Sequence, residues 1–161
     1  MKIIGIDPGL AATGIGIVEG THLKIAAYRY GSIETPKDRS PAERLDLIFS
    51  RLVSVLEDEI PDLMIVEDVF SLKENPKSGI VLGKVSGVVL LAGHRSRIPV
   101  AEIAVREAKQ VLTGNGRAGK EQLETAVRHH LNCRVPIRPF HASDALALAI
   151  IGLYRSAEAS P

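Results

Sequence analysis

The sequence predicts an α/β domain built on a mixed sheet, and three observations lead there. An Ile-rich run over residues 2–7, the turn residues Pro8-Gly9 and a second alternating apolar run are typical of a β-hairpin. Residues 22–33 continue as a third strand, so we expect the first three strands to be antiparallel. The unbroken apolar run that starts at Leu63 follows a helical segment, which is typical of a parallel strand buried on both faces.

The length and composition indicate a single globular domain. The chain has 161 residues, and we expect the domain to span residues 1–156, with residues 157–161 as a frayed tail. Hydrophobic content of 45% and charged content of 24% exclude a disordered chain. No signal peptide or membrane span is evident, and a single cysteine excludes an internal disulfide, so we expect a cytoplasmic protein without membrane contact.

Charge is unevenly divided between the two parts of the chain. Residues 1–70 hold 7 Lys and Arg against 12 Asp and Glu, whereas residues 71–161 hold 13 against 7. The net charges of −5 and +6 indicate either a basic face for a polyanion in the second part or an ordinary solvated surface.

The first helix is marked by its capping residues. Ser40 precedes Pro41 and stands three residues before Glu43, which is the pattern of a capping box with proline at the first helical position. Apolar residues then recur at helical spacing, so the helix is expected to end near Glu59 and to place one face on the sheet.

A second helix, expected from Ser78 to about Arg97, carries Gly79, Gly83 and Gly87 at every fourth position. Glycine costs helix stability by about 1 kcal/mol per residue, so we expect a compensating close approach of another backbone. The resulting smooth face is predicted to pack on another helix or on a second subunit.

Short elements follow this helix. Residues 98–103 are expected to form another parallel strand, and residues 104–112 a helix in which Arg106 and Lys109 share one face. A glycine-rich basic turn over residues 113–120 then leads into the next helix.

Acidic residues end two of the strands that are expected to be buried. Asp7 ends the first, where its carboxylate either accepts the N–H groups of the turn or binds a metal ion. Glu67 and Asp68 end the run that starts at Leu63, and because neighbouring strand residues face opposite ways, only one of them can join Asp7. The alternation alone leaves both choices open.

Basic and aromatic residues follow these acids. Phe70 stands before a polar loop that contains Lys73 and Lys77, and it is either a core residue or a platform on which a nucleic-acid base stacks. The later turn includes Arg117 and places Lys120 at a helix N-terminus, where a phosphate oxygen is favoured. Its spacing departs from that of a nucleotide P-loop, so a backbone phosphate is the better interpretation.

His141 and Asp144 stand three residues apart at the start of a strongly apolar last helix. Each alone is typical of a helix cap, but together with the strand-end acids they indicate a metal site. Such ligands favour Mg²⁺ or Mn²⁺, and two ions could activate a water and stabilise the departing oxygen of a phosphodiester.

The order of these motifs resembles the RuvC family of bacterial Holliday junction resolvases. The matching segments are GIDPG at residues 5–9, VEDVF at 66–70, the basic turn that ends in Lys120, and HASDALALA at 141–149. The similarity covers nearly the whole chain. GIDPG alone is unspecific, because sugar kinases and Hsp70-type ATPases open similarly.

The resemblance implies a fold and a metal site. The fold is RNase H-like, of the retroviral integrase superfamily, with a mixed five-stranded sheet flanked by helices. The implied site is Asp7, Glu67, His141 and Asp144, which favours Glu67 over its neighbour. Family members often have Asp in place of His141, and an imidazole favours Mn²⁺ over Mg²⁺ or serves as a general base.

The resemblance also implies DNA contacts and a homodimer. Phe70 would stack on a base near the scissile strand, and Lys109 and Lys120 would contact phosphates. The other basic residues of these segments are further candidates for DNA binding, namely Lys73, Lys77, Arg106 and Arg117. The glycine-bearing face of the second helix would suit the dimer interface.

The function implied by the resemblance is a metal-dependent endonuclease of homologous recombination and DNA repair. It would place symmetric nicks in a four-way junction, leave 5′-phosphate and 3′-hydroxyl ends, and work with the RuvA–RuvB branch-migration complex. An actin-like ATPase is disfavoured because that fold needs two such domains. A catalytically silent junction-binding module is disfavoured because all four ligand positions carry suitable residues.

Overall fold

A five-stranded mixed sheet forms the centre of the computed structural model, which describes residues 1–21, 24–68 and 76–158. The sheet order is β3-β2-β1-β4-β5, with β1–β2 and β2–β3 antiparallel and β1–β4 and β4–β5 parallel. This arrangement confirms the predicted mixed sheet and its three antiparallel strands. The strands are β1 (Lys2–Asp7), β2 (Ala12–Thr21), β3 (Lys24–Glu34), β4 (Leu63–Glu67) and β5 (Val100–Ile103).

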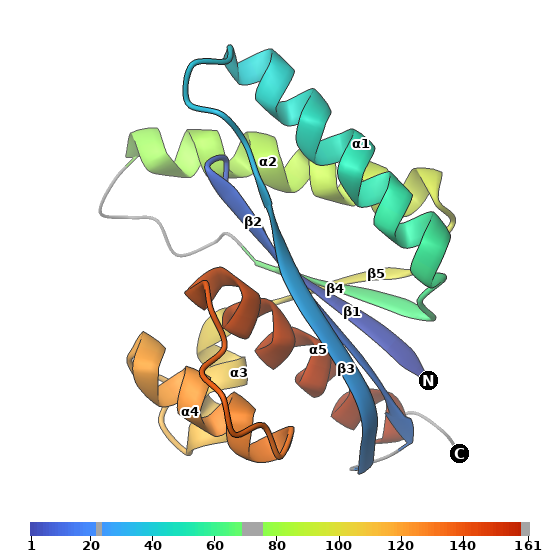
Figure 1. Ribbon diagram of the computed structural model, residues 1–161, viewed down its shortest axis with the longest axis vertical. Helices are drawn as coiled ribbons and strands as arrows, with labels where there is room; N and C mark the ends of the chain where they lie inside the picture. Colours follow the sequence, from blue (N-terminus) through green and yellow to red (C-terminus); the bar gives the residue numbers. More distant parts are fainter. Residues whose placement is uncertain (22–23, 69–75, 159–161) are drawn as a thin grey trace.

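Helices cover both faces of this sheet (Figure 1). One face packs on the first two helices, and the other packs on the last helix, which is itself covered by the two short ones. The helices are α1 (Pro41–Glu59), α2 (Pro76–Arg95), α3 (Val105–Thr113), α4 (Lys120–His130) and α5 (Phe140–Glu158).

The capping box predicted for α1 is confirmed. The Glu43 N–H donates to the Ser40 hydroxyl at 3.3 Å, and the Ser40 N–H donates to the Glu43 carboxylate at 2.8 Å. These bonds satisfy N–H groups that the first turn of a helix leaves without a partner.

Element ends differ from the predictions by a few residues. β5 begins at Val100 rather than at residue 98, and α2 lies about two residues earlier than expected. β4 ends at Glu67, so Asp68 lies beyond the strand that was expected to include it. Such ends depend on backbone pairing with neighbours, which local sequence patterns do not contain.

The C-terminal part of the chain is helical up to Glu158, and residues 159–161 lie outside the described residues. The limits of the domain and its tail therefore stay a prediction. None of the helices in the described ranges has the length and apolar character needed to cross a membrane.

Candidate active site

Asp7 ends β1 and is held there by a tight turn. Its side chain is only 9% exposed. The hydroxyl of the fully buried Thr13 donates to the Gly9 carbonyl oxygen at 2.9 Å, and the Gly9 N–H points back at the same hydroxyl at 3.4 Å. Thr13 thus provides the hydrogen-bond partner of the Gly9 backbone in this turn, so the Asp7 carboxylate is available for other partners.

Glu67 ends β4, which runs parallel to β1, so the two acids reach the same end of the sheet. The Glu67 carboxyl group lies close enough to that of Asp7 for the two to share a proton, which helps to raise the pKa of Glu67. The structure therefore brings Glu67 to Asp7. The choice between the two acids that alternation left open falls on Glu67.

The last helix, α5, brings His141 and Asp144 to the same place. A Cβ atom on Gly14 of β2 would overlap the α5 backbone at His141, and one on Gly16 would overlap it at residues 145–146. A Cβ atom on Gly5 of β1 would overlap the same helix at residues 145 and 149. Without side chains at these strand positions, the helix lies directly on the sheet. As a result, His141 Nδ1 stands 2.5 Å from the Asp7 Oδ2 atom.

Excess negative charge dominates the electrostatics of this cluster. Burial, followed by the hydrogen bond and charge of Asp7 and the charge of Asp144, raises the pKa of Glu67 to about 9. Burial and the charge of Asp7 raise the pKa of Asp144 to about 6. The pKa of His141 is also raised, because its hydrogen bond to Asp7 outweighs its burial. The site thus favours bound protons or another positive charge.

The donor set suits a hard divalent cation, although the side chains pair with one another. Within the described ranges, no three His, Cys, Asp or Glu side chains are arranged as a ready-made metal cage. Asp7 contacts both His141 and Glu67. Carboxylates whose charge is poorly compensated are the ligands that Mg²⁺ and Mn²⁺ prefer, so the chemistry of this donor set fits such an ion.

A comparison with protein families matches residues 3–152 to the model described as crossover junction endodeoxyribonuclease RuvC. The chain belongs to the RuvC family. All four residues of the candidate site lie inside the matched range.

Individual RuvC proteins agree with this assignment along most of the chain. The crossover junction endodeoxyribonuclease RuvC of Carboxydothermus hydrogenoformans is 39% identical over 155 residues, which cover 96% of this chain and 97% of that protein. Its counterpart in Thermotoga petrophila is 42% identical over 149 residues, which cover 92% and 90%. Thermus thermophilus RuvC in complex with Holliday junction substrate superposes with a TM-score of 0.89 at 30% identity, covering 98% and 96%. The expected RNase H-like fold is thereby confirmed.

Two of the basic residues that the resemblance to the RuvC family singled out lie beside the acids. Lys109 of α3 is close enough to Glu67 and Asp144 for its positive charge to offset a small part of the rise in the pKa of both. Lys120 begins α4, and its positive charge opposes the rise in the pKa of Asp144 and of His141. Both lysines therefore border the cluster, as a phosphate-binding role requires.

The remaining basic candidates differ in position. Arg106 packs along Gly116 of the basic turn, and Arg117 is exposed in that turn. Lys77 lines a groove of about 420 Å³ together with Leu10, which follows the turn after Asp7. Phe70 and Lys73 lie outside the described residues.

The strand glycines and Glu124 contribute to the site but were not predicted from the sequence. Glu124 of α4 is only 3% exposed and accepts hydrogen bonds from the Ile137 N–H at 2.8 Å and from Arg128 Nε at 2.9 Å. It thereby ties α4 to the segment that leads into α5. From the sequence, Glu124 was recognised only as an acid near the start of a helix. The strand glycines had a signal, namely the alternation of glycine with isoleucine in β2 opposite an alanine-rich helix.

Proposed function

We propose that this chain is a metal-dependent endonuclease that resolves four-way DNA junctions during homologous recombination and DNA repair. It would cut two strands of like polarity symmetrically and leave 5′-phosphate and 3′-hydroxyl ends. The observation that carries the proposal is the meeting of Asp7, Glu67 and Asp144 from three separate elements, with the pKa of Glu67 raised to about 9. Membership of the RuvC family supplies the substrate class.

Asp7, Glu67, Asp144 and His141 would hold the metal. One or two bound Mg²⁺ or Mn²⁺ ions would supply an activated water and positive charge for the departing oxygen. His141 shares its Nδ1 side with Asp7, which leaves Nε2 to bind an ion or to take a proton. His141 as a ligand favours Mn²⁺ as the better-tolerated ion.

Basic residues around the cluster would bind the DNA backbone. Lys109 and Lys120 border the acids and would contact phosphates near the cut, and Lys77, Arg106 and Arg117 would extend this surface. Phe70 and Lys73 remain predicted contacts to a base and to a phosphate. Because such contacts release counterions, junction affinity should fall steeply with salt.

A homodimer would match the two-fold symmetry of a junction. The outer face of α2 carries Gly83 and Gly87, whose added Cβ atoms would meet nothing within 4 Å, and Ile80 and Leu91, which are 62% and 51% exposed. Together with the half-buried Gly79, this face is suited to a second copy of the chain.

The proposed function also includes cooperation with a RuvA–RuvB complex and a cytoplasmic location.

The test is cleavage of a labelled four-way junction against a linear duplex of the same sequence, with Mg²⁺ or Mn²⁺. Wild type should place paired nicks in the junction alone. Asp7→Asn should lose at least about 100-fold in rate while still binding the junction, because it loses a ligand that contacts two other site residues. The exposed Asp58→Asn of α1 is the matched control and should cleave like wild type.

Other results would change the assignment. Junction binding without cleavage in either metal would indicate a silent binding module. Turnover of ATP would indicate the actin-like alternative. Equal cleavage of the duplex would contradict junction selectivity.

A further inference from the structure

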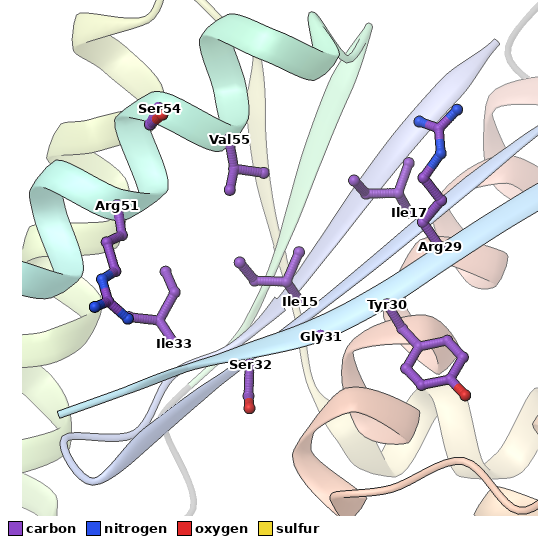
Figure 2. A pocket seen from close by; sticks show the side chains of 10 residues that line it. All are labelled: Ile15, Ile17, Arg29, Tyr30, Gly31, Ser32, Ile33, Arg51, Ser54 and Val55. Carbon is purple, nitrogen blue, oxygen red and sulfur yellow. The ribbon is translucent and has the colours of Figure 1, made fainter.

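A groove of about 440 Å³ lies between α1 and the end strand β3, on the sheet face opposite α5 (Figure 2). Branched apolar side chains from β2, β3 and α1 form its floor, and two arginines stand at its margins. The residues concerned are Ile15, Ile17, Ile33, Val55, Arg29 and Arg51. His141 and Asp144 come from α5, so the groove is separate from the candidate active site.

The groove is open because of Gly31. This residue pairs with Ile15 in the β2–β3 ladder, and a Cβ atom built on it would meet nothing within 4 Å. β3 is also the last strand of the sheet, so its outer edge has no strand partner in the described part of the chain. An 11-residue edge strand is a ready template for another extended segment.

The charged side chains that line the groove are both arginines, Arg29 and Arg51. No acidic side chain is among the lining residues. Arg51 forms no ion pair within the described ranges. Arg29 is paired with Glu59 at 2.5 Å and with Glu19 at 3.6 Å, although 57% of its side chain is exposed. Figure 2 shows Arg51 reaching along the groove toward Ile33.

The groove chemistry fits a peptide better than a nucleic acid. Figure 2 shows the Tyr30 ring on the other side of β3, so it offers no stacking platform to a base in the groove. An aliphatic floor adds nothing to the binding of phosphates, but it receives apolar side chains of a peptide. The edge of β3 can in addition pair with a peptide backbone.

We propose that this groove docks an extended acidic segment of another protein, which pairs with the edge of β3 and places an apolar side chain over Gly31. The acidic side chains of that segment would face Arg51, because Arg29 is already paired with Glu19 and Glu59. Docking on this face leaves the acids at the ends of β1 and β4 accessible to substrate. The surface would therefore let a partner protein hold the enzyme while it acts.

The test uses a fluorescein-labelled peptide of alternating Asp and Leu, with binding followed by fluorescence anisotropy on the full chain. We expect micromolar affinity, which falls by about tenfold or more in Gly31→Leu and in Arg51→Glu. Arg134→Glu makes the same charge change at an exposed site outside the groove and should bind like wild type. Junction cleavage should be unchanged in Gly31→Leu, which shows that this variant is folded.

Further probes separate the alternatives. A peptide with N-methyl groups on alternate amides should lose affinity, and hydrogen exchange should slow in residues 29–33 when the unmodified peptide binds. The proposal is overturned if the peptide fails to bind at micromolar concentration, or if both groove variants bind it normally. Weaker junction binding by Arg51→Glu would also overturn the proposal, because the groove would then be a DNA-binding surface. A changed oligomeric state of Gly31→Leu would overturn it too, because the groove would then bind a second copy of the chain.

Discussion

Glycines occur at regular spacing in two regions of this molecule, with opposite consequences. In the strands, Gly14 and Gly16 lie against the backbone of α5 so closely that a methyl group would overlap it. In α2, Gly83 and Gly87 face open space, and a methyl group would meet nothing within 4 Å. Among the described residues, the close backbone approach predicted for the α2 glycines is therefore absent at these two positions, and it occurs in the strands instead.

This difference shows that glycine spacing identifies a smooth surface but not its partner. The strand glycines are needed inside the chain, because they let α5 carry His141 and Asp144 to Asp7. The α2 glycines lower the stability of the helix, and no close contact among the described residues offsets this loss of stability. This is consistent with a contact to another copy of the chain. Whether that contact forms stays a prediction.

The largest expected effect comes from filling the space under α5. Gly14→Ala should lower the free energy of unfolding by about 3 kcal/mol or more, because the new Cβ meets the rigid His141 backbone and not a side chain that can move. Urea unfolding measures this change, with Gly31→Ala, a strand glycine whose added Cβ would meet nothing within 4 Å, as the matched control. A Gly14→Ala protein as stable as wild type would contradict the close packing of α5 on β2.

Much of the fold could be predicted from sequence because its signals are local. The hairpin after Asp7, the capping box at Ser40 and the apolar run before Glu67 each depend on residues near one another in the chain. The fit of α5 on the strand glycines joins residues more than a hundred positions apart, and nothing local to Gly14 reports it. Glu124 was missed for the same reason, since its partner Ile137 lies beyond the end of its helix.

The next largest effect is the pH dependence of stability, which depends on how closely α5 holds the acids together. With metal removed by a chelator, the folded protein binds protons at Glu67 with a pKa of about 9, whereas 4.5 is the ordinary value. The raised pKa values of Asp144 and His141 act in the same direction. The stability from Glu67 is fully present below about pH 4.5 and is lost as the pH rises toward 9.

Urea unfolding between these pH values measures this loss. Glu67→Gln should flatten the fall in stability with pH, and added Mn²⁺ should reverse it by supplying the missing positive charge. Asp58→Asn, at an exposed position of α1, should keep the wild-type slope. Metal-free stability that rises with pH over this window would contradict the proton-bound state of Glu67.

A smaller effect tests the outer face of α2. Gly87→Leu places a bulky side chain on the surface proposed for the dimer and should weaken self-association by about tenfold or more, as measured by analytical ultracentrifugation. Gly31→Leu, which adds the same side chain on β3, is the control and should associate like wild type. If Gly87→Leu leaves association unchanged, the dimer interface lies elsewhere.

The smallest effect gives the sharpest separation between the two glycine regions. In the Gly87→Leu background, where association is weakened, Gly83→Ala should raise the free energy of unfolding by about 0.5–1 kcal/mol, because alanine fits a helix better than glycine and meets no neighbour here. In the otherwise wild-type chain the same alanine should weaken self-association, because it adds atoms to the proposed interface. A gain in monomer stability combined with a loss of association would show that these glycines serve a contact between molecules. A loss of monomer stability would show instead that α2 packs inside the chain as the strand glycines do.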